Sequence, residues 1–232
     1  MATFARNKRS FASHLKKDNW REYLQEIVEG GTASVSPLFS FLLGEPLLAH
    51  RAAFALGQTL AKLAETDPER ARIAVRRFMW HMSEESGNIG WGIPYAFSEA
   101  LSASPLLAKE YRNILISYII ELGFDDNYCD NDLLRRQCYW AIGNFAAHRQ
   151  DLAEKARPWL LKGLQDRDDI CKGMAAWALG QLKPDLNDLP ALKNLANSGI
   201  TEECEIYEDD SLRQIPVSEL AKETLNKIKS TS

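Results

Sequence analysis

A short segment recurs along this chain of 232 residues and limits the folds that the chain can adopt. Three copies share the order aromatic, alanine, aliphatic, glycine, amide, at residues 54–58, 140–144 and 177–181. A weaker copy at 89–99 has Ser98 at the glycine position, and a degenerate copy covers 218–226. Measured at that position, the copies are 41, 45, 37 and 46 residues apart. This spacing is typical of a two-helix repeat with its turns.

Each copy has the pattern of a buried helix. Its apolar side chains are three or four residues apart, and alanine at two of these positions lets neighbouring helices approach closely. Amphipathic segments between the copies are expected to be the first helices of the pairs, at 38–43, 69–82, 106–122, 153–164 and 189–196. No Asn-Gly or Asp-Gly hairpin signal interrupts the helices, so we expect no strands. Asp67, Ser104 and Asp151 are predicted helix N-caps.

The order Ala-Ala-aromatic-Ala-Leu-Gly-Gln after an aliphatic and basic start resembles the second helix of HEAT repeats. It is especially similar to the short bacterial HEAT-like repeats first noted in phycobilisome lyases, and the block 79–92 resembles an uncharacterised bacterial HEAT-repeat family. The resemblance covers about residues 35 to 228. It implies an all-α, right-handed α-solenoid of about five HEAT-like helix pairs. We expect a single domain over 1–232, with an N-terminal cap helix in 1–34 and an acidic insertion at 201–215 before the last helix.

Composition and motifs narrow the function classes. The net charge of −4 argues against nucleic acid, because a DNA-binding face needs a basic balance. The longest nearly apolar run, 114–120, is far shorter than the ~20 residues that cross a bilayer, and the N-terminal segment does not resemble a secretory signal. We therefore expect a cytoplasmic protein with no membrane contact. The four cysteines have no metal-ligand spacing, and Cys138 and Cys171 are predicted core residues.

Recognisable catalytic motifs are absent from the sequence. No His-Glu dipeptide, phosphate-binding glycine loop or nucleophile turn is present, so we expect neither a metal nor a cofactor. The basic cluster Arg70, Arg72, Arg76 and Arg77 has glutamates nearby, which is typical of a solvated helix face.

Three features could nevertheless carry a function. The break at 84–94 has three glycines in six residues, and it is either a tight turn covered by Trp91 or a binding loop. A lateral stripe on the second helices either packs between repeats or forms the inner wall of the solenoid; its trios are His50/Phe54/Gln58, Trp91/Tyr95/Glu99, Arg136/Trp140/Asn144 and Gly173/Trp177/Gln181. The acidic segment 201–210 is expected to be a solvated edge, with a docking patch or a hairpin as alternatives.

These observations favour a non-enzymatic scaffold or adaptor that binds a protein partner along the concave face of the solenoid. The predicted contact residues combine aromatic and arginine anchors with orienting charges: Trp80, Glu84, Glu85, Trp91, Glu99, Arg136, Trp140 and Asn144. Two alternatives remain open. One is a lyase-like chaperone that delivers a tetrapyrrole or similar chromophore, and the other is a HEAT-like DNA glycosylase for alkylated bases.

The partner-binding hypothesis makes a direct prediction. Substitution of Trp91 and Arg136 together should weaken capture of the partner from native lysate while leaving the helical content unchanged. Wild type and double variant are compared side by side by affinity capture and circular dichroism. Unfolding of the double variant would instead assign both side chains to packing.

Overall fold

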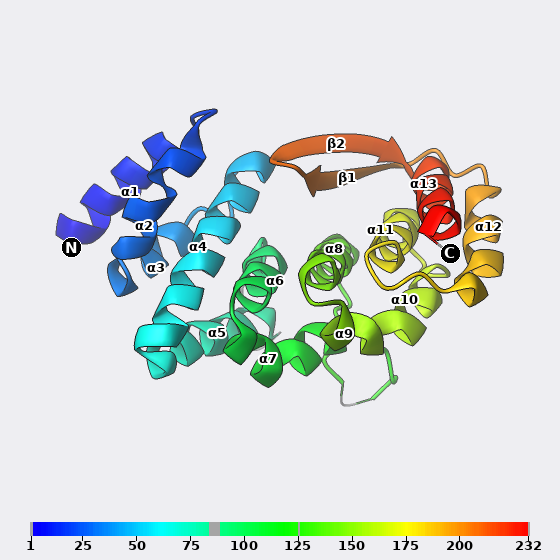
Figure 1. The fold of residues 1–232 in the computed structure, drawn as a ribbon, viewed down its shortest axis with the longest axis horizontal. Coiled ribbons are helices and arrows are strands. Elements are labelled where there is room, and N and C mark those ends of the chain that lie inside the picture. Colours follow the sequence, from blue (N-terminus) through cyan, green and yellow to red (C-terminus); the bar gives the residue numbers. More distant parts are fainter. Residues whose placement is uncertain (1, 84–88, 125, 232) are drawn as a thin grey trace. The chain divides into compact units, whose positions relative to one another are not determined.

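The computed structural model describes residues 2–83, 89–124 and 126–231 (Figure 1). The elements in chain order are α1 (Ala2–Leu15), η1 (Trp20–Tyr23), α2 (Leu24–Glu29), α3 (Thr32–Phe39), α4 (Pro46–Thr66), α5 (Pro68–Met82), α6 (Ile93–Ala103), α7 (Pro105–Ser117), α8 (Asp132–His148), α9 (Gln150–Ala153), η3 (Glu154–Ala156), α10 (Arg157–Gly163), α11 (Asp169–Leu179), η4 (Leu186–Asp188), α12 (Leu189–Ala196), β1 (Glu203–Glu208), β2 (Ser211–Pro216) and α13 (Val217–Thr231). Helices dominate, and the predicted all-α solenoid class is confirmed.

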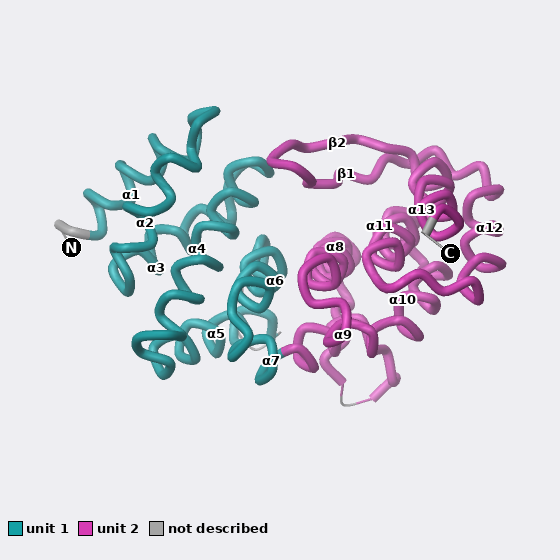
Figure 2. Tube along the Cα trace, in the orientation of Figure 1, with its two compact units in different colours: residues 1–111 teal, residues 112–232 magenta. Residues whose placement is uncertain are grey.

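The chain divides into two compact units, residues 1–111 and 112–232, with the division inside α7 (Figure 2). In the first unit α4 packs against α3, α5 and α6. In the second unit α11 packs against α8, α10 and α13, and α12 packs against α13. The repeat copies therefore form the second helices of their pairs, as expected. That the units make one continuous domain stays a prediction.

The equivalent glycines lie at the contacts between successive second helices. A Cβ atom on Gly57 of α4 would lie 2.6 Å from Cβ of Glu99 on α6. On Gly143 of α8 it would lie 2.3 Å from the Trp177 ring and 3.0 Å from Cα of Ala178, both on α11. Gly180, which follows α11, faces Thr224 of α13 less closely, at 3.2 Å. The period read from the sequence is thus the period of helix packing.

Side-chain N-caps are present at the starts of α5, α7, α8 and α11. The Asp67 carboxylate accepts a hydrogen bond from the Arg70 N–H, and the Ser104 hydroxyl accepts one from the Leu107 N–H, as predicted. Asn131 and Asp168 cap α8 and α11 in the same manner. The prediction for Asp151 is wrong, because α9 begins one residue earlier and the Asp151 carboxylate pairs with Lys183.

The N-terminal segment differs from the expected single cap helix. It contains α1, the short turn η1, α2 and the start of α3. Arg51 of α4 fixes α1 in place, since its Nη1 donates hydrogen bonds to the carbonyl oxygens of Leu15 and Lys17. A cation at these last carbonyls also complements the negative end of the helix dipole.

The expectation that no strands occur is wrong. Residues 203–216 of the acidic insertion form an antiparallel hairpin in which Cys204 pairs with Ile215 and Ile206 with Arg213. Asp209 and Asp210 make the turn with φ of 48° and 62°. This backbone is usually provided by Asn-Gly or Asp-Gly, but aspartate also tolerates it. Cys204, Ile206 and Ile215 are buried, so only part of the segment is a solvated edge.

The glycine contacts make a stability prediction within the second unit. Gly143→Ala places a methyl group against Trp177 and the α11 backbone, and such overpacking costs about 1–3 kcal/mol. The higher helix propensity of alanine offsets only about 1 kcal/mol of this. We therefore expect Gly143→Ala to lower the urea midpoint of unfolding, followed by circular dichroism.

Gly180→Ala is the matched control. Its nearest atoms belong to the Thr224 side chain at 3.2 Å, which can adjust, and to a carbonyl at the same distance. The control should unfold at or near the wild-type midpoint. An equal loss in both variants would show that the close helix approach is not the cause.

Candidate functional site

The predicted contact residues of the first unit have different environments. Trp80 on α5 is 56% exposed, and Trp91, just before α6, is half-buried. Glu99 on α6 is only 6% exposed, because its backbone lies against α4. Glu84 and Glu85 lie outside the described residues. Trp80 and Trp91 are therefore the accessible members of this group among the residues that the structure describes.

The predicted contact residues of the second unit lie at four-residue spacing on α8. Arg136 makes a two-pronged ion pair with Asp168, with its Nε 2.9 Å from Oδ1 and its Nη2 2.6 Å from Oδ2. Trp140 is 3% exposed, and Asn144 is half-buried. A partner that used Arg136 would compete with Asp168, which also caps α11.

The hairpin covers the aromatic part of the lateral stripe in this unit. The Trp140 and Trp177 rings are nearly parallel at 6.0 Å between centroids. The Trp140 Nε1–H donates to the carbonyl of Tyr207 at 3.3 Å, and the Trp177 Nε1–H donates to Oε1 of Glu208 at 2.9 Å. Buried indoles normally find such acceptors. These contacts support the packing interpretation for both tryptophans.

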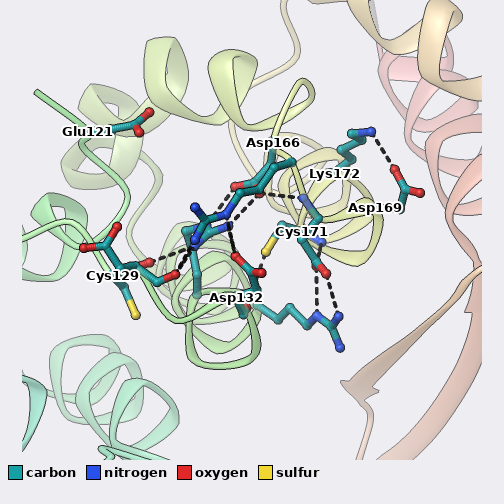
Figure 3. A network of polar contacts seen from close by, with 12 residues as sticks. Glu121, Cys129, Asp132, Asp166, Asp169, Cys171 and Lys172 are labelled. Atoms are coloured by element: carbon teal, nitrogen blue, oxygen red, sulfur yellow. Dashed lines mark hydrogen bonds and ion pairs between the residues drawn. The ribbon is translucent and has the colours of Figure 1, made fainter. Parts of the chain in front are cut away.

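A network of charges joins α8 to the turn before α11 (Figure 3). The guanidinium of Arg135 is fully buried and donates two hydrogen bonds to Asp166, at 2.8 and 2.7 Å. It also donates to Asp132 at 2.7 Å and to the carbonyl oxygens of Cys129 and Asp130. All three nitrogens of this guanidinium, Nε, Nη1 and Nη2, thus have acceptors, as burial of a cation requires.

The charges of the network stabilise the ionised forms of its members. Hydrogen bonds from Arg135 and Arg167 lower the pKa of Asp132. Burial alone would raise the pKa of Asp168, but Arg136 and the Cys171 N–H together lower it to about 2. Burial raises the pKa of the Cys171 thiol, so this cysteine is no thiolate nucleophile near neutral pH. The network is a structural joint between repeats.

An open pocket lies in the first unit, at the break that the sequence singled out. Its volume is about 540 Å³, within the range of ligand pockets. The floor is formed by the buried residues Leu42, Gly90 and Ile93, and the rim carries the exposed side chains of Leu43 and Ile89. The other lining residues are Phe39, Ser40, Arg77, His81 and Trp91. We call this the α5 pocket.

Two glycines shape the wall of the α5 pocket. Gly92 has φ of 71°, and a Cβ atom there would lie 2.3 Å from the Leu42 carbonyl oxygen. A Cβ on Gly90 would lie 2.8 Å from the His81 carbonyl oxygen. Both positions therefore need glycine for the chain to pass close to its neighbours. The described part of the break, residues 89–94, is thus a tight connection, and Gly90 also lines the α5 pocket.

Arg77 is the cation of the α5 pocket. Its guanidinium carbon lies 3.8 Å from the centroid of the Phe39 ring, in the geometry of a cation–π contact. Arg70, Arg72 and Arg76 on the same helix pair with Asp67, Glu110 and Glu69. Within the described part of the chain, Arg77 has no carboxylate partner. Partial burial lowers the pKa of Arg77, but an arginine stays charged near neutral pH.

His81 lies beside this cation, with its ring 5.0 Å from that of Phe39. Burial and the positive charge of Arg77 both lower the pKa of His81. The imidazole is therefore neutral near pH 7 and can donate or accept one hydrogen bond. The α5 pocket thus combines an apolar floor with one fixed positive charge at its rim.

Exposed apolar side chains continue the surface of the α5 pocket along α5. Ile73 and Trp80 are four residues before and three residues after Arg77, so they share its side of the helix. Both are 56% exposed. Together with Leu43 and Ile89 they place four large exposed apolar side chains around one arginine. Such grouping is typical of interaction surfaces.

Four residues of the α5 pocket were not predicted from the sequence as site residues: Phe39, Leu43, Arg77 and His81. The arginine cluster was interpreted as one solvated face, which holds for the three arginines that pair with acids. The positions three and four residues away from Arg77 on both sides hold no acid, but the same is true of Arg76, so spacing alone does not single out Arg77. The contribution of Phe39 could not be found this way, since it depends on tertiary packing.

A smaller cavity of about 230 Å³ lies in the second unit. Its wall includes Tyr128, Tyr139 and Trp159, together with Glu121 and Lys162. Its charged groups already pair with one another: Lys162 with Glu121, and Arg167 with Asp132. Burial raises the pKa of Tyr128 to about 12. This cavity therefore offers a ligand fewer uncommitted groups than the α5 pocket.

The described residues contain neither a metal-binding cluster nor a membrane-spanning helix. Among them, no three His, Cys, Asp or Glu side chains gather in a way that could hold a metal ion. Likewise, none of the described helices is both long and apolar enough to span a bilayer.

Comparison with known proteins shows which residues of the chain are similar to known helical repeats. Residues 132–182, which contain α8 to α11, match the family model of a HEAT-like repeat. No curated protein matches the chain significantly. Among solved structures, a designed armadillo repeat protein in complex with the peptide (KR)4 is similar to this chain with a TM-score of 0.57. The two are 16% identical, and the alignment covers 95% of this chain and 91% of that chain.

The Arg135 network makes a prediction about stability. Arg135→Ala leaves the Asp166 carboxylate buried without its cation, and breaking a buried pair in this way costs about 3–5 kcal/mol. Arg167→Ala removes an exposed arginine from the same network, where an ion pair contributes about 0–1 kcal/mol. Urea unfolding of both variants should show a large loss for Arg135→Ala alone. Equal losses would contradict the role given to Arg135.

Proposed function

Because this chain is a repeat protein of the HEAT and armadillo type, we propose that it is a non-enzymatic adaptor that binds a segment of a protein partner in the α5 pocket. The observation that carries the proposal is the α5 pocket itself, an open cavity of about 540 Å³ with an apolar floor and exposed apolar side chains at its rim. Burial of such a surface by a partner is the main source of binding free energy in protein complexes.

The chemistry of the α5 pocket supports recognition. The Ser40 hydroxyl donates a hydrogen bond to the Pro37 carbonyl, so the structure gives this oxygen no general base. His81 is the titratable group of the lining near neutral pH, and its neighbour is a cation. Apolar side chains with a few fixed polar groups are what a binding pocket for a peptide segment requires.

The proposed site is the α5 pocket, whereas the sequence predicted contacts along the concave face. In the second unit Trp140 and Trp177 are buried beneath the hairpin, so the aromatic members of that face offer little surface to a partner. The α5 pocket uses the end of α5 and the connection before α6. Trp91 and Trp80 of the predicted set belong to this surface, and we propose them as contact residues.

The fold comparison supports a peptide or protein partner. The designed armadillo protein of similar fold holds a peptide, and stacked helix pairs commonly present extended binding surfaces. The chromophore-carrier and glycosylase hypotheses stay predictions of the sequence.

The test is selection of a random displayed peptide library on the full chain. Leu43→Asp puts a charge at the apolar rim, at a side chain that is 69% exposed and outside the core. We expect selected peptides to lose at least about tenfold in affinity for this variant, measured by fluorescence anisotropy. Retained circular dichroism confirms that the variant is folded.

Leu186→Asp is the matched control, since Leu186 is similarly exposed and belongs to the second unit. Its affinity for the selected peptides should equal that of wild type. A selection that yields no specific peptide, or peptides that bind Leu43→Asp as well as wild type, would refute the proposal.

A further inference from the structure

We propose that the α5 pocket selects segments in which a carboxylate lies next to a bulky apolar side chain, and that Arg77 binds this carboxylate. The inference rests on the proposed function and adds the chemistry of the partner. Its basis is the arrangement of Arg77, Phe39 and the apolar floor of the α5 pocket.

The first argument is the pairing of the α5 arginines. Arg76, the neighbour of Arg77 in sequence, has its Nη2 2.5 Å from Oε1 of Glu69. Arg72 makes two hydrogen bonds to Glu110, at 2.9 and 2.6 Å. The corresponding contact of Arg77 is with an aromatic ring instead of an acid. Arg77 is therefore the arginine of this helix whose charge a partner can neutralise.

The second argument is orientation. The guanidinium carbon of Arg77 lies 3.8 Å from the centroid of the Phe39 ring, and this contact restricts the motion of the guanidinium. A guanidinium has five N–H donors in its plane, and the contact with an aromatic ring leaves donors for a ligand. A carboxylate matches two of these N–H groups at once, which a single amide oxygen cannot do. An arginine held by this ring contact is thus preorganised for a planar anion.

The third argument is the separation of charge and apolar surface. Arg77 lies at the rim, whereas Leu42 and Ile93 form the buried floor. A segment that fills the floor with an apolar side chain brings its neighbouring residue to the rim. An acid at that place pairs with Arg77, while a lysine there would be repelled.

The experiment repeats the random-library selection on wild type, Arg77→Gln and Arg76→Gln. On wild type, we expect Asp and Glu to be enriched over Asn and Gln beside bulky apolar residues. Arg77→Gln should lose this preference and keep the apolar one. Arg76→Gln removes a neighbouring arginine that pairs within the chain, so its selected peptides should match those of wild type.

A double-mutant cycle then measures the contact directly. The probes are two synthetic peptides. The first is the peptide selected most strongly on wild type, and in the second its acidic residue is replaced by the corresponding amide. We expect the change to weaken binding to wild type about tenfold and binding to Arg77→Gln less than twofold. Added salt should reduce the difference, because the interaction is electrostatic.

The outcomes separate the inference from the proposed function. Peptides that depend on Leu43 but show no acid preference, or no coupling to Arg77, would refute the inference alone. A selection without any specific peptide would refute both. Dodecanoate that displaces the peptide with equal affinity would assign the pocket to small amphiphilic acids and refute a peptide partner. Dimerisation of the unliganded chain that Arg77→Gln abolishes would assign the occupant to a second copy, and would refute a separate partner.

Discussion

Each unit depends on the close approach of successive second helices at one position of the repeat. At this position a glycine leaves no room for a Cβ atom, as at Gly57 against Glu99 and at Gly143 against Trp177. Because a helix pair contacts chiefly its neighbours, the local contact sets how every pair is placed against the next. The ends of the helices then meet at defined places. The α5 pocket is one such place, formed where the end of α5 meets the connections before α4 and α6.

The helical repeats were predictable because helix packing requires similar residues at equivalent positions of each repeat, and these positions recur at a nearly fixed spacing in the sequence. The expected helices 69–82 and 189–196 differ from α5 and α12 by one residue at most. The hairpin, which was only an alternative in the sequence analysis, was not the favoured prediction for two physical reasons. Its turn uses Asp209 and Asp210 where a glycine would have signalled a hairpin, and its support comes from Trp140, 67 residues before Tyr207. Contacts at that separation leave no local pattern.

The candidate site was likewise predictable from the sequence only in part. The run of glycines drew attention to Trp91, which lines the α5 pocket. Phe39 and Arg77 belong to other elements, and their meeting is a result of the fold. A pocket built by three segments cannot be read from any one of them. What the sequence does contain is a cluster of four arginines on α5, three of which pair with acids in the structure.

The hairpin changes how the second unit can open. In a stack of helix pairs the terminal pair has one neighbour and usually frays first. Here β2 leads directly into α13, while β1 supplies the acceptors for indole N–H groups on α8 and α11. Separation of the last helix pair would break the hydrogen bonds of both indoles. Slow amide hydrogen exchange in α13 is therefore linked to that in α8. These distant pairings also raise the contact order, and the second unit should fold more slowly than a plain helical repeat of its length.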